Sequence, residues 1–181
     1  MKVVKIILVI LLTILVLLFV SSLFLPSSYK IERSLTMKAE PEEIFPYFDS
    51  LRKWKDWTVW NKKLDSTLQF IYEGKEAGVG AVEKWTSINL DNGTIAITKS
   101  QPVKMIEYVM SMDDGKFRLN GRVAFVLTSK GTVVSWGQFG DLGFNPMNRW
   151  FTFLFMDKYL GPDLEQGLAN LKIIVEQKRL K

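Results

Sequence analysis

The feature that most constrains this chain is an uninterrupted apolar run near its N-terminus. Residues 6–25 read IILVILLTILVLLFVSSLFL, carry no charged side chain, and are closed by Pro26. At about 1.5 Å of rise per residue, such a run forms a helix about 30 Å long, which matches the hydrocarbon core of a bilayer. The run therefore predicts a membrane-spanning helix, with the rest of the chain on one side of the membrane.

A cleavable signal peptide is the alternative interpretation of the same run. Signal peptides have shorter apolar cores, about 7–15 residues long, that end in a small-x-small cleavage site. Here the pair Ser21-Ser22 is followed by Leu-Phe-Leu-Pro, so cleavage would leave an apolar new terminus. We therefore expect residues 1–26 to be an uncleaved single-pass anchor and residues 27–181 to be one domain.

The charges that flank the run predict its orientation. Lys2 and Lys5 precede it, whereas Lys30 and Arg33 follow it and are partly offset by Glu32. Because positively charged flanks are retained in the cytoplasm, the N-terminus should lie inside and the domain outside the cytoplasm.

Composition removes several classes of chemistry. The chain has no histidine and no cysteine, so it cannot build Ser-His-Asp or thiolate nucleophiles, disulfides or the usual zinc sites. We expect no cofactor and no metal site, and catalysis is less expected than binding. The net charge of +5 falls to +3 without Lys2 and Lys5, and the remaining excess is scattered, so no nucleic-acid partner is predicted.

Alternating hydrophobicity predicts an antiparallel sheet. Apolar and polar side chains alternate through residues 29–37, which is typical of a half-buried strand. Two short helical segments follow, near residues 40–48 and in WKDWTVW (54–60), and further strands with tight turns occupy residues 67–140. A hairpin turn is expected at Asp91-Asn92-Gly93, because Asn-Gly tolerates the positive φ angles of a two-residue type I′ loop. About seven strands in total are predicted.

The C-terminal segment is predicted to be a long helix that closes the sheet. Asn145-Pro146 is typical of a helix start, and an apolar stripe at helical spacing runs from Leu164 to Val175. A kink or two abutting helices are expected at Gly161-Pro162, because proline disrupts a helix interior. The order of elements predicts an α+β fold.

That order resembles the helix-grip arrangement of the START-like, SRPBCC superfamily, and in particular its membrane-anchored bacterial members labelled polyketide cyclase/dehydrase. The matching segments are IERSLTMKAEPEEIFPYF, WKDWTVW, GKEAGVGAVEKW, TVVSWGQFGD and MDKYLGPDLEQGLANLK, which together span nearly all of residues 29–172. The resemblance implies a curved antiparallel sheet around a long C-terminal helix, enclosing an elongated apolar cavity. It does not imply cyclase activity, because a fold does not carry a function.

Aromatic residues supply most of the candidate ligand-binding positions. A pocket for a flat or acyl ligand needs rigid apolar walls with a few polar tips, although most buried aromatic residues only pack the core. Trp54, Trp57 and Trp60 are three residues apart, so a helix would direct them to one face, toward the sheet or the membrane. The candidate ligand-binding residues are Trp57, Trp60, Glu83, Trp85, Tyr108, Phe125, Trp136 and Phe153.

A continuous cavity is expected between the sheet and the closing helix, lined by Trp85, Tyr108 and Trp136. The helix segment 150–156, WFTFLFM, is apolar almost all round, so part of it cannot face the sheet. It is either a membrane-facing portal to the cavity or is covered by the 141–148 loop and the tryptophan helix.

Glu83 is the candidate ionisable group of this cavity. It shares strand parity with Trp85, so the two side chains point to the same face. Arg33 could pair with it, since buried charges are usually paired. Alternatively, a raised carboxyl pKa in a dry pocket would make Glu83 a catalytic acid or base. Asp157 on the closing helix is expected to be a solvated charge.

Three classes of function remain open from the sequence. The first is a membrane-tethered, non-catalytic binding protein for a lipid or other hydrophobic small molecule. The second is an enzyme that acts on an apolar or aromatic small molecule, with Glu83 as the acid or base. The third is a chaperone-like or protein-interaction module that uses the tryptophan face.

Overall fold

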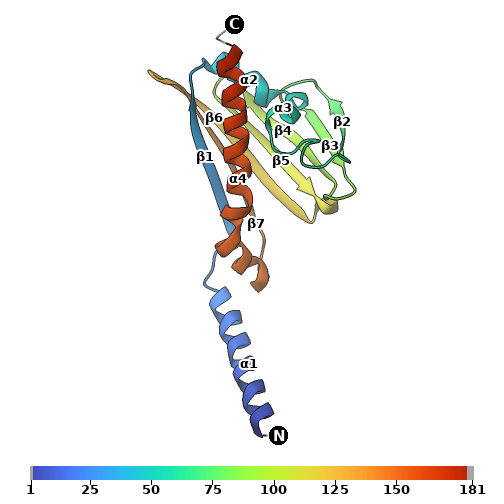
Figure 1. Cartoon of the computed structure of the whole chain (residues 1–181), viewed down its shortest axis with the longest axis vertical. Helices are drawn as coiled ribbons and strands as arrows, with labels where there is room; N and C mark the ends of the chain where they lie inside the picture. Colours follow the sequence, from blue (N-terminus) through green and yellow to red (C-terminus); the bar gives the residue numbers. More distant parts are fainter. Residues whose placement is uncertain (1, 179–181) are drawn as a thin grey trace.

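Seven antiparallel strands form one curved sheet in the computed structural model, which describes residues 2–178 (Figure 1). The spatial order is β1-β7-β6-β5-β4-β3-β2, so β2 to β7 form a meander and β1 returns to pair with β7. The strands are β1 (Ser28–Met37), β2 (Gln69–Gly74), β3 (Ala81–Thr86), β4 (Gly93–Gln101), β5 (Met105–Met112), β6 (Phe117–Thr128) and β7 (Gly131–Asp141).

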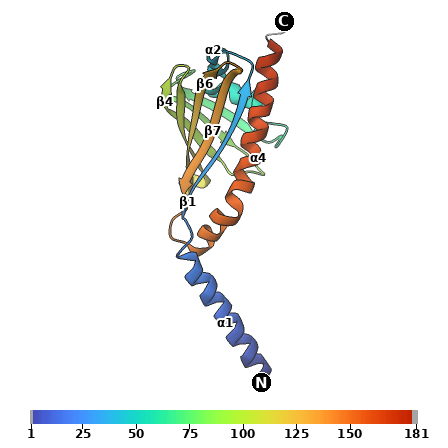
Figure 2. The ribbon, with the colours of Figure 1, turned by 90° about the vertical axis from the view of Figure 1, so that its left-hand side faces the viewer.

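One long helix runs along the concave side of the sheet, and shorter helices cover one end of it (Figures 1 and 2). The helices are α1 (Lys2–Ser22), α2 (Pro41–Asp49), α3 (Trp54–Trp57) and α4 (Pro146–Lys178), with 3-10 turns η1 (Leu51–Lys53) and η2 (Asp113–Gly115). This is the α+β helix-grip fold that the sequence predicts. Helix α1 projects away from the rest of the molecule (Figure 1).

Helix α2 begins where the sequence signals predict. Pro41 occupies the first turn, and the backbone N–H of Glu40 donates to the Glu43 carboxylate at 2.8 Å, which completes a capping box. The helix buries Ile44 and Phe48 against the sheet side. After α2 the chain continues into η1 and then into α3, which begins at Trp54.

A cluster of aromatic rings fills the end of the sheet that α2 and α3 cover. Phe48 lies 4.6 Å from Trp57 and Trp57 lies 5.1 Å from Trp136, measured between ring centroids. Trp54 meets Tyr108 edge-on at 5.1 Å. Such tilted and edge-on pairs are the favoured arrangements of aromatic rings, and each adds about 0.5–1.5 kcal/mol beyond area burial. This cluster is the rigid part of the core.

Helix α4 approaches the sheet closely at two glycines. A Cβ atom at Gly161 would overlap the Arg33 guanidinium, and one at Gly167 would lie 2.9 Å from the Trp136 ring. Arg33 on β1 donates to Asp157 at 2.8 Å and to Glu165 at 2.5 Å, and these carboxylates lie on either side of Gly161 along α4. The glycines and the arginine thus fix the height of α4 above the sheet.

The start of α4 is bonded to the end of α1. Arg149 donates through Nη1 to the carbonyl oxygens of Leu23 at 3.0 Å and Leu25 at 2.9 Å. The Trp150 indole N–H donates to the Leu18 carbonyl at 3.2 Å, one turn before the end of α1. The Leu18 carbonyl also accepts from the Ser21 hydroxyl at 3.0 Å, and Leu23 and Leu25 follow α1, so these bonds join the start of α4 to both α1 and the segment after it.

The structure decides between the two expectations for α4 and corrects two other local predictions. Helix α4 runs through Pro162 as one helix, so no pair of abutting helices forms, and its first half bends away from the axis of the second, in agreement with a kink (Figure 2). The tryptophan helix ends at Trp57, so Trp60 lies in the loop beyond it. No two-residue turn forms at Asn92-Gly93: the connection from β3 to β4 includes residues 87–92, and neither Asn92 nor Gly93 has a positive φ.

Replacing Gly121 by alanine should destabilise the domain by about 1–3 kcal/mol, the usual cost of overpacking a core. A Cβ atom at Gly121 would overlap the Tyr108 ring, which lies across this residue on the paired strand. Denaturant unfolding of the full-length chain in micelles, followed by tryptophan fluorescence, measures the change. Gly137→Ala is the control, because its Cβ would meet its nearest atoms at 3.4 Å; equal effects would contradict the packing argument.

Candidate ligand-binding pocket

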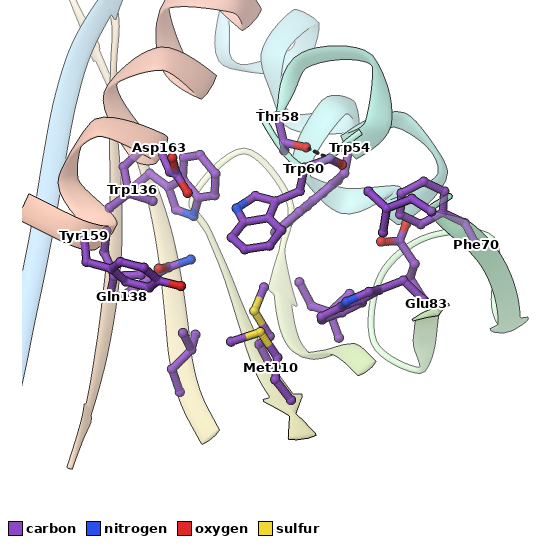
Figure 3. A pocket seen from close by; sticks show the side chains of 17 residues that line it. Trp54, Thr58, Trp60, Phe70, Glu83, Met110, Trp136, Gln138, Tyr159 and Asp163 are labelled. Atoms are coloured by element: carbon purple, nitrogen blue, oxygen red, sulfur yellow. Dashed lines mark hydrogen bonds between the residues drawn. The ribbon is translucent and has the colours of Figure 1, made fainter. Parts of the chain in front are cut away.

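A pocket lies between the concave face of the sheet and α4, beside the aromatic cluster (Figure 3). The cavity volume is about 60 Å³, several times the space that one water molecule needs. It is lined by Trp54, Thr58, Trp60, Leu68, Phe70, Glu83, Trp85, Ile95, Met110, Met112, Leu119, Trp136, Gln138, Tyr159, Leu160, Asp163 and Leu164. The wall is mainly apolar, with few polar tips, as in small-molecule sites generally.

The tryptophan side chains of the wall are held in place by hydrogen bonds to the protein. The indole N–H of Trp54 donates to the Phe48 carbonyl at 3.0 Å, and that of Trp85 donates to the Asp91 carbonyl at 2.8 Å. The indole N–H of Trp136 donates to the Tyr108 hydroxyl at 2.9 Å. Because these donors are satisfied inside the protein, the three rings present apolar surface to the pocket.

Tyr108 is fully buried and organises the floor of the pocket. Its hydroxyl oxygen accepts from Trp136 and also from the Gln138 side-chain amide, at 3.2 Å. Burial raises the pKa of Tyr108 to about 12, so the hydroxyl stays protonated. Gln138 itself lines the pocket, and this bond to Tyr108 fixes its side chain there.

Glu83 is the most unusual group in the wall. It is only 6% exposed, and its Oε2 atom has no hydrogen-bond partner among the described residues. Burial raises the pKa of Glu83 to about 7, opposed by the Tyr72 hydroxyl and by the charge of Lys55. Tyr72 lies opposite Glu83 in the β2–β3 register. Its hydroxyl is near enough to act on the Glu83 pKa, yet it forms no well-aligned hydrogen bond and is itself unpartnered.

Asp163 supplies a second carboxyl group from α4. It is half-buried, and desolvation raises its pKa, opposed by a hydrogen bond from Trp60. Asp163 therefore comes from the helix side of the pocket, whereas Glu83 comes from β3 in the sheet (Figure 3).

A separate cluster of polar side chains fixes the loop before β2 through hydrogen bonds to Asp65. Asp65 accepts from the Thr67 backbone at 2.9 Å, from the Asn89 amide at 3.0 Å, and from the Ser87 hydroxyl. These donors hold the pKa of Asp65 well below its usual range. The cluster joins the segments before β2 and after β3 and so supports Leu68 and Trp85 in the wall. Among the described residues, no group of three or more acidic, histidine or cysteine side chains is placed to hold a metal ion.

The structure divides the eight predicted ligand-binding residues into two groups. Trp60, Glu83, Trp85 and Trp136 lie in the pocket wall. The other four lie outside it: Trp57, Tyr108 and Phe125 pack in the buried core, and Phe153 is 59% exposed on α4. The expectation that Tyr108 lines the cavity is corrected, because it lies behind Trp136 and holds that ring through its hydroxyl.

The predicted pairing of Arg33 with Glu83 is wrong. Arg33 binds Asp157 and Glu165 on α4 instead, which also corrects the expectation that Asp157 is only a solvated charge. The reason is topological: β1 lies at the opposite edge of the sheet from the β2–β3 pair, so Arg33 meets α4 rather than β3.

Several wall residues were not among the predicted binding positions. Met110 and Met112 share strand parity with the inward-facing Tyr108, so the alternation of β5 carried a usable signal. Tyr159 and Asp163 occupy successive turns of α4, and their contribution depends on how the helix is rotated against the sheet. The sequence gives no local signal for that rotation.

Fold and pocket together define a START-like, SRPBCC-type protein, with a sheet curved around a long C-terminal helix. The sequence profile of the family described as "Polyketide cyclase / dehydrase and lipid transport" matches residues 28–176. The chain belongs to this family. A search of the curated proteins gave no significant match.

Solved structures of low sequence identity share the fold. A protein of unknown function from Staphylococcus aureus has a TM-score of 0.63 at 11% identity, covering 85% of this chain and 97% of that one. The Aha1 dimer from Colwellia psychrerythraea has a TM-score of 0.57 at 17% identity, with coverages of 82% and 96%. A protein from Chromobacterium violaceum has a TM-score of 0.57 at 15% identity, with coverages of 82% and 98%.

Replacing Glu83 by glutamine should stabilise the chain above neutral pH. Burial raises the Glu83 pKa from its ordinary value of 4.5 to about 7, so the unfolded chain loses this proton at lower pH than the folded chain. The carboxyl therefore favours the folded state below pH 4.5, and that advantage is lost as pH rises to about 7. Glutamine does not ionise, so the variant should avoid a loss of up to about 3 kcal/mol.

Denaturant unfolding of the full-length chain in micelles at pH 5 and pH 8 measures this effect. The control is Glu73→Gln, which removes an exposed carboxylate from β2. If Glu83→Gln gains no more stability than Glu73→Gln between pH 5 and pH 8, the raised pKa is contradicted.

Proposed function

We propose that the chain is a membrane-tethered binding protein that holds a lipid or other hydrophobic small molecule in the pocket between the sheet and α4. The observation that carries the proposal is the character of the wall: tryptophan rings whose N–H groups are satisfied inside the protein, with Met110 and Met112 between them. Such a wall favours apolar contact over hydrogen bonding. The family description, which includes lipid transport, is consistent with it.

Binding without catalysis fits the side chains better than an enzyme does. The chain contains no histidine or cysteine, and Glu83 is the wall group whose pKa is raised to near neutrality. That carboxyl, with the Tyr72 hydroxyl beside it, is the observation that favours an enzyme as the second candidate. The two candidates differ in one outcome: a binding protein releases its ligand chemically unchanged.

A protein-interaction role through the tryptophan face has less support. Trp54 and Trp57 are buried against the core, and Trp60 turns toward the pocket. The predicted outward-facing tryptophan surface is therefore not available to a partner.

Methionine methyl groups provide a direct test of pocket binding in the full-length chain. Of the seven methionines, Met110 and Met112 line the pocket, whereas Met37 is buried at the β1 end of the sheet. Adding the neutral apolar probe 2-phenylethanol to the chain in phosphatidylcholine bicelles should shift the Met110 and Met112 methyl NMR signals and leave Met37 unchanged. No shift at saturating probe, or an equal shift of Met37, contradicts the proposal.

Membrane tethering rests on α1 and on its contacts with α4. Helix α1 has 21 residues, is strongly apolar and is exposed over residues 2–20, which makes it a candidate membrane span or signal sequence. Trp150 donates to Leu18 near its C-terminal end, and Arg149 donates to Leu23 and Leu25 in the segment that follows it. The Trp150 bond favours retention of α1 as an anchor, since removal of α1 would leave the indole N–H without its Leu18 acceptor. The positive flank of Lys2 and Lys5 supports a cytoplasmic N-terminus, with the domain outside the cytoplasm.

The first half of α4 is proposed to lie on the bilayer. Its exposed apolar side chains, together with one from the preceding loop, are Phe144, Met147, Phe151, Phe153, Leu154, Phe155 and Tyr159. Neither the 141–148 loop nor the tryptophan helix covers them, which corrects one of the two sequence expectations. Trp150 bonds to the Leu18 carbonyl inside the apolar run, and this contact supports a position of the half-helix at the membrane boundary. Tyr159 also lines the pocket, so the apolar surface continues to its rim.

A depth measurement at position 153 tests this placement. The chain lacks cysteine, so Phe153→Cys can be labelled with an NBD fluorophore at one site in the full-length protein reconstituted in vesicles. The label should be strongly quenched by lipids that carry a nitroxide near the headgroup. Ile173→Cys is the matched control, because Ile173 is 55% exposed on the other half of α4.

If the labels at 153 and 173 are quenched equally, α4 does not lie on the bilayer. Recovery of a mature chain that begins near Leu23 would contradict the anchor itself.

A further inference from the structure

The charged side chains in the pocket wall are acidic. Among the described residues that line it, Glu83 and Asp163 carry carboxyl groups and none is lysine or arginine. A ligand with its own carboxylate or phosphate, such as a fatty acid, would bring like charge beside these groups with little water to screen it. The wall therefore disfavours anionic ligands.

Glu83 has unmet capacity to accept a hydrogen bond. Its Oε2 atom is buried without a partner among the described residues, and the neighbouring Tyr72 hydroxyl is also unpartnered. A buried carboxyl oxygen without a donor costs free energy that a donor supplied by a ligand would recover. Lys55, the basic group that acts on Glu83, is exposed on α3 and does not line the pocket.

The aromatic rings around Glu83 favour positive charge. Trp85 is two residues from Glu83 on the same face of β3, and Phe70 pairs with Trp85 across the β2–β3 register. The Trp85 N–H donates to the Asp91 carbonyl, so the ring presents its π surface, and not a hydrogen-bond donor, to the pocket. An ammonium group held near the face of such rings is attracted by their quadrupole.

We propose that the ligand is an amphipathic amine, with its ammonium group bound by Glu83 and a compact apolar body against the tryptophan and methionine side chains. This inference rests on the proposed function of the pocket and adds the chemical class of the ligand. Asp163 adds negative potential from the α4 side. The cavity volume of about 60 Å³ is small, so it suits the ammonium group and a short part of the attached chain as the part enclosed beside Glu83.

Three matched probes test the chemical class at pH 7. 2-Phenylethylamine, 2-phenylethanol and phenylacetate share a phenyl ring and a two-carbon chain but carry a positive, a neutral and a negative group. Titration of each against the full-length chain in phosphatidylcholine bicelles, followed by the Met110 and Met112 methyl signals, gives the affinities. The amine should bind about tenfold tighter than the alcohol, because bonds between charged partners are stronger than neutral ones. Phenylacetate should bind most weakly.

Variants at two glutamates test whether Glu83 causes the preference for the amine. Glu83→Gln should reduce the amine affinity about tenfold and reduce the alcohol affinity much less, because a neutral hydroxyl can still donate to the glutamine amide oxygen. Glu73→Gln, which removes an exposed carboxylate of the same charge on β2, should change neither affinity. Unaltered amine binding by Glu83→Gln, or alcohol binding as tight as amine binding, overturns the amine assignment while the pocket still binds apolar molecules. If no probe shifts Met110 and Met112, the proposed function fails together with this inference.

Discussion

The close packing of α4 on the sheet determines the shape of the pocket and the position of the helix above it. Gly161 leaves space for the Arg33 guanidinium, and Gly167 leaves space for the Trp136 ring. Arg33 then binds one carboxylate on each side of Gly161, which fixes the rotation of the helix as well as its height. In that rotation Tyr159 and Asp163 face the sheet side and become part of the pocket wall. The pocket is therefore a consequence of helix docking rather than of any one loop.

The same helix links the pocket to the proposed membrane surface. Its second half packs on the sheet, and its first half carries exposed aromatic side chains such as Phe151 and Phe155. Arg149 and Trp150 bind carbonyl oxygens of α1 and the segment after it, so the exposed half starts beside the end of the apolar run. One continuous helix thus runs from the proposed bilayer surface to the pocket rim, giving an apolar ligand a short path with little exposure to water.

Local patterns in the sequence predict much of the fold but only part of the site. Strand alternation places Glu83 and Trp85 on one face, and both line the pocket. Contacts between distant elements could not be predicted in this way, because no local pattern indicates which carboxylate Arg33 will bind. Gly93 illustrates the limit: it looks like a hairpin glycine, yet its absent Cβ leaves space for the Trp85 ring.

If the pocket holds a hydrophobic small molecule taken from the membrane, that molecule should be detectable by native mass spectrometry of the full-length chain, purified from its own membranes and released from nanodiscs. We expect one small hydrophobic molecule per chain to remain bound after loosely bound bilayer lipid is lost, and to be recovered chemically unchanged. A chain that carries only the polypeptide mass once the loose lipid is removed would contradict this expectation.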